Sequence, residues 1–186
     1  GGTQEKWLEQ QFQEAKNTNT VWNILGQSSL FGQRNNGSAS QPKFFYDGWD
    51  AYAANRQRII DQIEQYKVPN PVVLGGDIHE NWVGYVKKNF NANDLNNASS
   101  TNVAVEFCGT SISSRAKTVV EKILPNNPHF VYANSKYRGY GVAHFEAKTL
   151  TTTLKAVQDV KDPESGSFTL AQFVVPAGTK EIIKTI

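Results

Sequence analysis

The sequence contains one cysteine, Cys108, and no methionine among its 186 residues. A single cysteine excludes an internal disulfide, so an intracellular protein and an exported one without disulfides both remain open. No apolar run approaches the ~20 residues that a transmembrane helix needs. No signal-peptide or twin-arginine pattern opens the sequence. Because the first residue is Gly1 rather than Met, we expect a processed product or a fragment of a longer chain.

The sequence also lacks a strong excess of charge of one sign. The net charge is +2 and the isoelectric point is about 8.6. This charge is too mild and too evenly spread to indicate a nucleic-acid groove or an anionic membrane surface. With 39% hydrophobic residues, the composition is that of a soluble globular protein, and 186 residues are enough for one domain with a sizeable core.

The first two-thirds of the chain alternates between strand and helix patterns. An apolar stripe at helical spacing, Trp7, Leu8, Phe12 and Ala15, opens the chain. The longest predicted helix covers 47–66. Strands are expected at 21–26, 72–74 and 103–107, a strand or short helix at 81–86, and a further helix at 116–124. Polar loops cover 32–42, which we expect to be mobile, and 89–102.

The last third has a different pattern, with residues 140–147, 150–160 and 168–175 alternating and rich in Thr, Val and Phe. This pattern is typical of an antiparallel meander with turns near 148–149 and 162–166. The expected fold class is therefore α/β, with strand–helix alternation followed by a C-terminal antiparallel meander.

Asp77 and His79 are the most informative residues. They follow the apolar strand at 72–74 and two glycines, Gly75 and Gly76. In extended backbone, residues two apart point to the same side, so a carboxylate and an imidazole would converge there on one metal. The alternative is that Asp77 caps the turn and that His79 is a partly buried histidine with a backbone partner.

Two other predicted strands also end in small polar loops, at Gln27-Ser28 and at Gly109-Thr110-Ser111. If these strands and the strand at 72–74 are parallel neighbours, the three loops meet at one rim, where α/β sheets place their sites. Gln27 either lines such a site or caps its own turn. Cys108, at a strand end, is either a metal ligand or a small buried residue, and we favour the buried residue.

Several blocks of the sequence resemble the PhoD-type alkaline phosphatases, which are calcineurin-like metallophosphoesterases. The blocks occur in the family's order at residues 47–52, Arg56 and Arg58, 70–79, 105–114, 127–130 and 138–140. The resemblance implies half of a two-sheet α/β/β/α sandwich, with residues 1–186 forming the C-terminal portion of one metallophosphoesterase domain. The upstream metal-ligand blocks of the family have no match in this sequence.

The resemblance also implies a function. It indicates hydrolysis of phosphate mono- and diesters with iron and calcium, in a periplasmic or secreted protein. Asp77 and His79 fall on the family's last metal-binding motif. This assigns Asp77 as a cation ligand, and His79 as a catalytic residue that binds the transition metal or contacts the bound phosphate. Trp49, Asp50 and Tyr52 match a family pattern of functional residues, but the interpretation we favour is a helix start with Asp50 in its first turn and two packed rings.

Three functions follow as hypotheses. The first is part of a phosphatase or phosphodiesterase site that is completed by a missing N-terminal half, so that the isolated chain is inactive. The second is a non-catalytic remnant, and the third is a phosphate- or sugar-binding module. The first also predicts an exposed apolar face where the missing sheet would pack.

Overall fold

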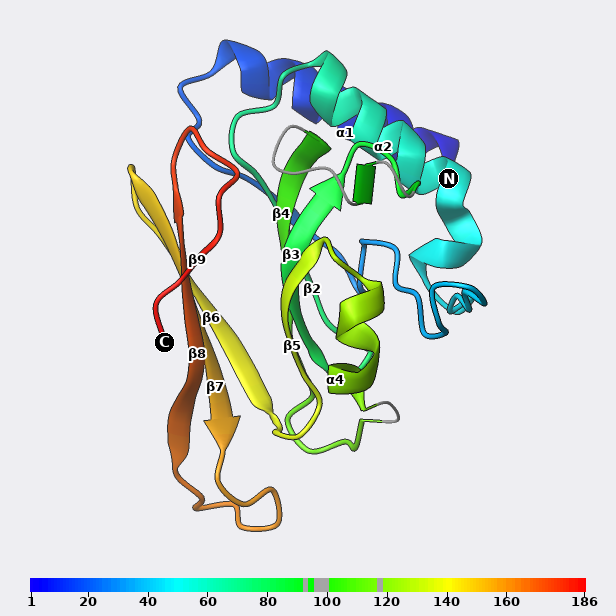
Figure 1. The fold of residues 1–186 in the computed structure, drawn as a ribbon. Helices are drawn as coiled ribbons and strands as arrows, with labels where there is room; N and C mark the ends of the chain where they lie inside the picture. Colours follow the sequence, from blue (N-terminus) through cyan, green and yellow to red (C-terminus); the bar gives the residue numbers. More distant parts are fainter. Residues whose placement is uncertain (92–93, 96–100, 117–118) are drawn as a thin grey trace.

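Two β-sheets pack against each other in the centre of the molecule, and helices cover the outer face of one of them (Figure 1). The computed structural model describes residues 1–91, 94–95, 101–116 and 119–186. The first sheet consists of β1 (Asn23–Gly26), β2 (Pro71–Gly75), β3 (Asn81–Lys87), β4 (Asn102–Cys108) and β5 (Phe130–Asn134). The second consists of β6 (Gly139–Phe145), β7 (Thr149–Val157), β8 (Ser167–Pro176) and β9 (Ile183–Lys184).

The first sheet is mixed and has the strand order β1-β2-β4-β3-β5. Strands β1, β2 and β4 are parallel, whereas β3 runs antiparallel to both β4 and β5. The segment at 81–86, for which the sequence left strand and helix open, is therefore a strand. Because β1, β2 and β4 run in the same direction, their carboxyl ends lie along one edge of the sheet.

Two helices cover the outer face of this sheet. They are α1 (Gly2–Asn17) and α2 (Ala53–Gln65), and a 3-10 turn, η1 (Trp49–Tyr52), precedes α2. Apolar residues of both helices, Phe12 and Ile60 among them, pack on Val73, Val86 and Ala104 of the sheet. The prediction that the helix near residue 47 is the longest was wrong. Its first turn is η1, and α1, with 16 residues, exceeds the 13 of α2.

A short helical segment covers the rest of this face. It comprises α4 (Val120–Ile123) and η3 (Leu124–Asn126), where the sequence predicted a longer helix over 116–124. Val120 and Ile123 pack with Trp82, Cys108 and Phe130. Positions 117–118 of the predicted helix, and 92–93 and 96–100 of the predicted loop at 89–102, lie outside the described residues.

The second sheet is the predicted antiparallel meander, and β9 extends it at one edge. Residues in β7 alternate between half-buried and buried, as expected for a strand with one face on a core. The inner face of the second sheet, with Leu150 and Leu154 of β7 and Phe173 of β8, packs on Val105 and Phe107 of the first sheet. No helix in the described part of the chain has the length and apolar character needed to cross a membrane.

The loop after β1 differs from its prediction. Residues 29–32 and Arg34 are buried, and the backbone of 31–36 is held by hydrogen bonds, so the mobile loop expected over 32–42 was wrong for its first part. A buried loop needs partners for its polar backbone groups. Four side chains from three other segments, Glu106, Arg56, Asn127 and His129, provide them.

Candidate active site

The three strand-end loops meet at one rim, as the sequence predicted for parallel neighbours. The backbone nitrogen of Gly109 donates to the carbonyl of Gly75 at 2.9 Å, and that of Gln27 donates to Leu74 at 3.0 Å. The loop after β1 lies so close to β2 that a Cβ on Gly75 would come within 2.2 Å of the Ser29 carbonyl oxygen. Glycine is therefore required at this close approach.

The geometry that the sequence suggested for Asp77 and His79 was wrong. Their backbone is not extended, because both residues adopt left-handed φ angles, 66° and 61°. The intervening Ile78 donates its N–H to the Gly76 carbonyl at 2.8 Å, which makes the segment a tight turn. Non-glycine residues in this region cost of order 1–3 kcal/mol each and persist where surrounding structure holds them, often at functional sites.

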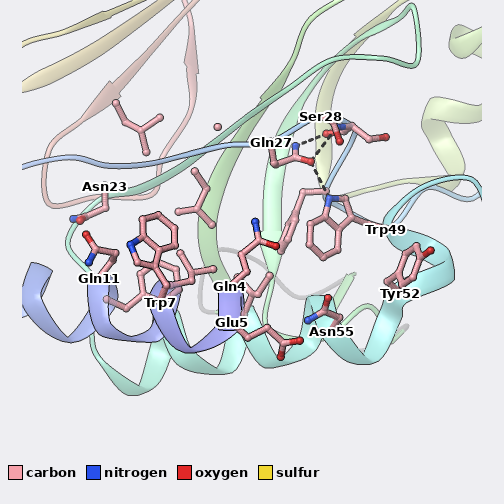
Figure 2. Close-up of a pocket in the computed structure, with 18 of the residues that line it drawn as sticks. Gln4, Glu5, Trp7, Gln11, Asn23, Gln27, Ser28, Trp49, Tyr52 and Asn55 are labelled. Carbon is pink, nitrogen blue, oxygen red and sulfur yellow. Dashed lines mark hydrogen bonds between the residues drawn. The ribbon is translucent and has the colours of Figure 1, made fainter. Parts of the chain in front are cut away.

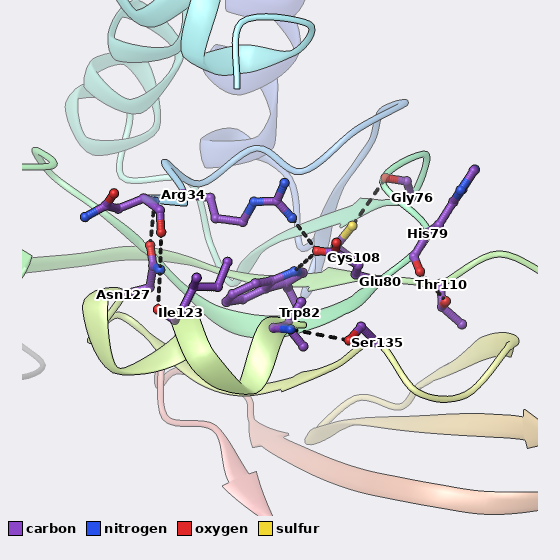
Figure 3. A network of polar contacts seen from close by, with 12 residues as sticks. Arg34, Gly76, His79, Glu80, Trp82, Cys108, Thr110, Ile123, Asn127 and Ser135 are labelled. Carbon is purple, nitrogen blue, oxygen red and sulfur yellow. Dashed lines mark hydrogen bonds and ion pairs between the residues drawn. The ribbon is translucent and has the colours of Figure 1, made fainter. Parts of the chain in front are cut away.

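The His79 ring has a defined orientation. Its Nδ1 lies 3.1 Å from the carbonyl oxygen of Arg115. A carbonyl can only accept a hydrogen bond, so Nδ1 carries a proton, and Nε2 has no hydrogen-bond partner among the described residues. Metal-binding histidines typically donate their other ring N–H in this way. The carbonyl of His79 accepts from the Thr110 hydroxyl at 2.9 Å (Figure 3).

Asp77 lies next to His79 in the same turn, and its side chain is exposed at the groove described below. Within the part of the chain that the structure describes, its carboxylate has no hydrogen-bond or ion-pair partner. The turn-capping alternative for Asp77 therefore has no side-chain hydrogen bond to support it. The same described residues contain no group of three or more His, Cys, Asp or Glu side chains that could hold a metal ion.

Beneath the turn lies a buried ion pair that the sequence analysis missed. Glu80 is 1% exposed, pairs with Arg34 and accepts a hydrogen bond from Trp82 Nε1 at 2.9 Å (Figure 3). Arg34 belongs to the loop after β1, so this pair joins that loop to the residue after His79. In the sequence, Arg34 and Glu80 are ordinary loop residues 46 positions apart, and no local pattern connects them.

A groove of about 1090 Å³ borders the rim on the side of α1 and β1 (Figure 2). Aromatic rings (Trp7, Trp22, Trp49 and Tyr52) and side-chain amides (Gln4, Gln11, Asn23, Gln27 and Asn55) line it, together with Asp77. Strand β1 is an edge strand, and its Ile24 is 49% exposed on this side, as is Trp7 at 56%. Exposed apolar side chains therefore border this groove.

The substrate candidates lie in different surroundings. The Gln27 amide oxygen accepts from Ser29 N at 3.0 Å and from Trp49 Nε1 at 2.8 Å, so Gln27 both caps its turn and borders the groove. Trp49 also packs on Phe31. Tyr52 lines the groove and is 65% exposed.

Asp50 does not line the groove with the other three candidates. It accepts from the buried Arg56 at 2.8 Å, and it and Arg56 are both almost fully buried. Arg56 and Arg58, which the family resemblance includes, both pair with carboxylates, because Arg58 contacts Glu5. Cys108 is fully buried, as expected, and burial raises the pKa of its thiol well above the usual value.

Glu106 is another buried group that the sequence analysis did not single out. It alternates with Val105 and Phe107, a pattern that also fits a solvent-facing position, yet its carboxylate accepts from Phe31 N at 2.5 Å and Gly32 N at 2.8 Å. Burial raises its pKa to about 7, although the two backbone N–H groups and Arg56 oppose that shift. Its role is to hold the loop after β1 against the sheet.

The family model described as "PhoD-like phosphatase" matches residues 1–154 of this chain. The chain belongs to the PhoD-like phosphatase family. Alkaline phosphatase D of Bacillus subtilis (strain 168) is 33% identical over 181 residues, which cover 94% of this chain and 29% of that protein. A solved structure titled "Structure of PhoD" matches with a TM-score of 0.84 at 28% identity, covering 100% of this chain and 35% of that one. This family member thus spans about a third of the length of these relatives.

Proposed function

We propose that this chain forms part of a metal-dependent phosphoric ester hydrolase acting on phosphate mono- or diesters. The observation that carries the proposal is the turn at Asp77 and His79. It lies at the carboxyl ends of parallel strands, holds both residues in left-handed conformations and fixes the ring of His79 through Nδ1. Membership of the PhoD-like phosphatase family gives this turn its chemical context.

Asp77 and His79 fit a metal site by their chemistry. The exposed Asp77 carboxylate offers oxygen atoms, which suit a hard cation such as calcium. The Nε2 of His79 suits a transition metal such as iron, or a contact with the bound phosphate. When bound, such metals lower the pKa of a coordinated water to about 7 and neutralise charge on the phosphoryl oxygens.

The rest of the site comes, in this proposal, from residues beyond this chain, and residues 1–186 form the C-terminal portion of one metallophosphoesterase domain. Two observations support this. The relatives are about three times longer than the matched region. The exposed edge of β1 and the groove beside it also offer an apolar surface next to Asp77. The isolated 186 residues are then inactive. By family membership we also propose a periplasmic or secreted location.

The test is hydrolysis of a nitrophenyl phosphomonoester and of the matching diester by the native-length protein loaded with iron and calcium. Asp77→Asn and His79→Gln should each lower kcat/KM by on the order of 10²-fold or more. Matched controls are Asp159→Asn in the exposed β7–β8 turn and His144→Gln, whose side chain is 69% exposed, and both should be neutral.

Full activity in both rim variants would refute the proposed roles. Saturable phosphate binding without turnover by the unsubstituted protein would instead support a phosphate-binding module.

A further inference from the structure

Arg138 is a buried arginine in the turn between β5 and β6, 7% exposed. Within the part of the chain that the structure describes, its guanidinium donates only to backbone carbonyls. Nη1 donates to His79 at 2.8 Å and to Ser114 at 2.9 Å, and Nη2 donates to Ser135. These carbonyls belong to three separate segments that meet at the rim.

A buried cation is costly, and arginine is rarely buried without a carboxylate partner. No acidic side chain lies within ion-pair distance of Arg138 among the residues that the structure describes. Burial accordingly lowers the pKa of the guanidinium. What the planar guanidinium adds over a neutral donor is a fixed geometry of several N–H groups, which here joins three segments.

The hydrogen bonds of Arg138 hold the backbone on both sides of the His79 ring contact. One nitrogen, Nη1, binds both the carbonyl of His79 and that of Ser114. The next residue, Arg115, provides the carbonyl that accepts from His79 Nδ1 at 3.1 Å. Arg138 therefore fixes the position of the histidine backbone relative to the acceptor of its own ring.

We propose that Arg138 is a positioning residue for His79, setting its ring orientation and its Nδ1–H tautomer through these backbone carbonyls. The positioning itself does not depend on the proposed function. Its consequence does, namely that Nε2 is held ready to bind a metal or phosphate. The Thr110 hydroxyl, which donates to the same His79 carbonyl at 2.9 Å, supports the same arrangement.

The experiment is Arg138→Lys in the native-length protein, which keeps the charge and removes the forked geometry. The matched control is Arg58→Lys, at an exposed arginine paired with Glu5. The first readout, on metal-free protein, is the tautomer of the His79 ring from its nitrogen chemical shifts, assigned by their absence in His79→Gln. The second is the affinity for Fe²⁺ alone, titrated without oxygen.

Arg138→Lys should convert the His79 signal from Nδ1–H to a mixture of tautomers and weaken Fe²⁺ binding by about 10–100-fold, as losses of outer partners of metal ligands do. Arg58→Lys should change neither. A folded Arg138→Lys protein with the original tautomer and affinity would overturn the proposal, even if its stability falls. If the unsubstituted protein binds no iron, the proposed function fails, and the tautomer readout still decides the role of Arg138.

If Arg138→Lys does not fold, Thr110→Val replaces it. That substitution removes the other side-chain donor to the His79 carbonyl with little change in shape. A shift of the His79 tautomer in the same direction supports the inference, and an unchanged tautomer overturns it.

Discussion

The inner face of the second sheet and the first part of the loop after β1 are both buried, but different interactions hold them. In the second sheet, apolar side chains such as Leu154 and Phe173 face the first sheet, and the backbone is satisfied by its own ladder. Residues 29–36 have no ladder, and polar side chains from other elements bind their backbone. A strand thus needs only an alternating apolar pattern and enough buried apolar area, whereas a buried irregular loop depends on particular polar partners for its backbone.

The largest effect is expected where apolar packing is removed between the sheets. Phe173 is fully buried, with its ring 6.3 Å from that of Phe107. Phe173→Ala should lower the free energy of unfolding by about 3–5 kcal/mol, because it removes apolar contact and leaves a cavity. Urea unfolding measures this. Tyr140→Ala, in the same sheet but 44% exposed, is the control and should cost far less.

The free energy that holds the loop after β1 should depend on pH, unlike the apolar packing of the second sheet. Burial raises the pKa of Glu106 from an ordinary 4.5 to about 7. The folded state therefore favours the protonated carboxyl of Glu106. The contribution of Glu106 to the free energy of unfolding is full below pH 4.5 and is lost as the pH rises toward 7. The stability of Glu106→Gln relative to the unsubstituted protein should increase over that window by about 3 kcal/mol. Urea unfolding at a series of pH values tests this.

His129 provides the companion with the opposite sign. Burial lowers its pKa from 6.5 to about 4, so its contribution to stability is lost as the pH falls from 6.5 to 4. In His129→Gln, the free energy of unfolding should therefore no longer fall between pH 6.5 and 4 because of this residue. In Glu106→Gln that fall should remain. Parallel pH profiles for the two variants would contradict this account of the buried groups.

A pair of glycines sharpens the comparison further. A Cβ on Gly75 would lie 2.2 Å from the Ser29 carbonyl oxygen, whereas a Cβ on Gly141 would meet nothing closer than 3.7 Å, at Leu154. Gly75→Ala should destabilise the protein by roughly 1–3 kcal/mol and displace the loop after β1. Gly141→Ala in β6 should be neutral or slightly stabilising. Equal thermal unfolding of the two variants would show that the rim is not tightly packed.

The smallest effect is a gain of stability in the second sheet. Thr152 is 2% exposed, and its hydroxyl has no hydrogen-bond partner among the described residues. Thr152→Val should raise the free energy of unfolding by about 1 kcal/mol, because an unpaired buried hydroxyl is costly. Its neighbour Thr153 accepts from Gln172 at 3.0 Å, so Thr153→Val is the control and should show no gain. Equal gains in the two variants would argue against this explanation.

Much of the fold was predictable because periodicity reports burial. The alternation in β7 and β8 and the helical spacing of the isoleucines in α2 are local patterns, and the structure confirms the elements they predicted. The rim was predictable too, because three apolar strands each end in a polar loop. The backbone of the Asp77–His79 turn was not, since a left-handed φ in two non-glycine residues has no local signature.

The sequence by itself therefore determined the class of fold, most of the strands and helices along the chain but not β5 or β9, and the edge where Gln27, Asp77 and Thr110 meet. Only the tertiary structure decided which polar groups are buried and what they bind. Arg34 pairs with Glu80, 46 positions away along the chain. Glu106 binds backbone groups 74 and 75 positions away, and Arg138 binds the carbonyl of His79, 59 positions away. Hydrophobic periodicity acts over a few residues, whereas the pairing of a buried charge depends on which distant segments the fold brings together.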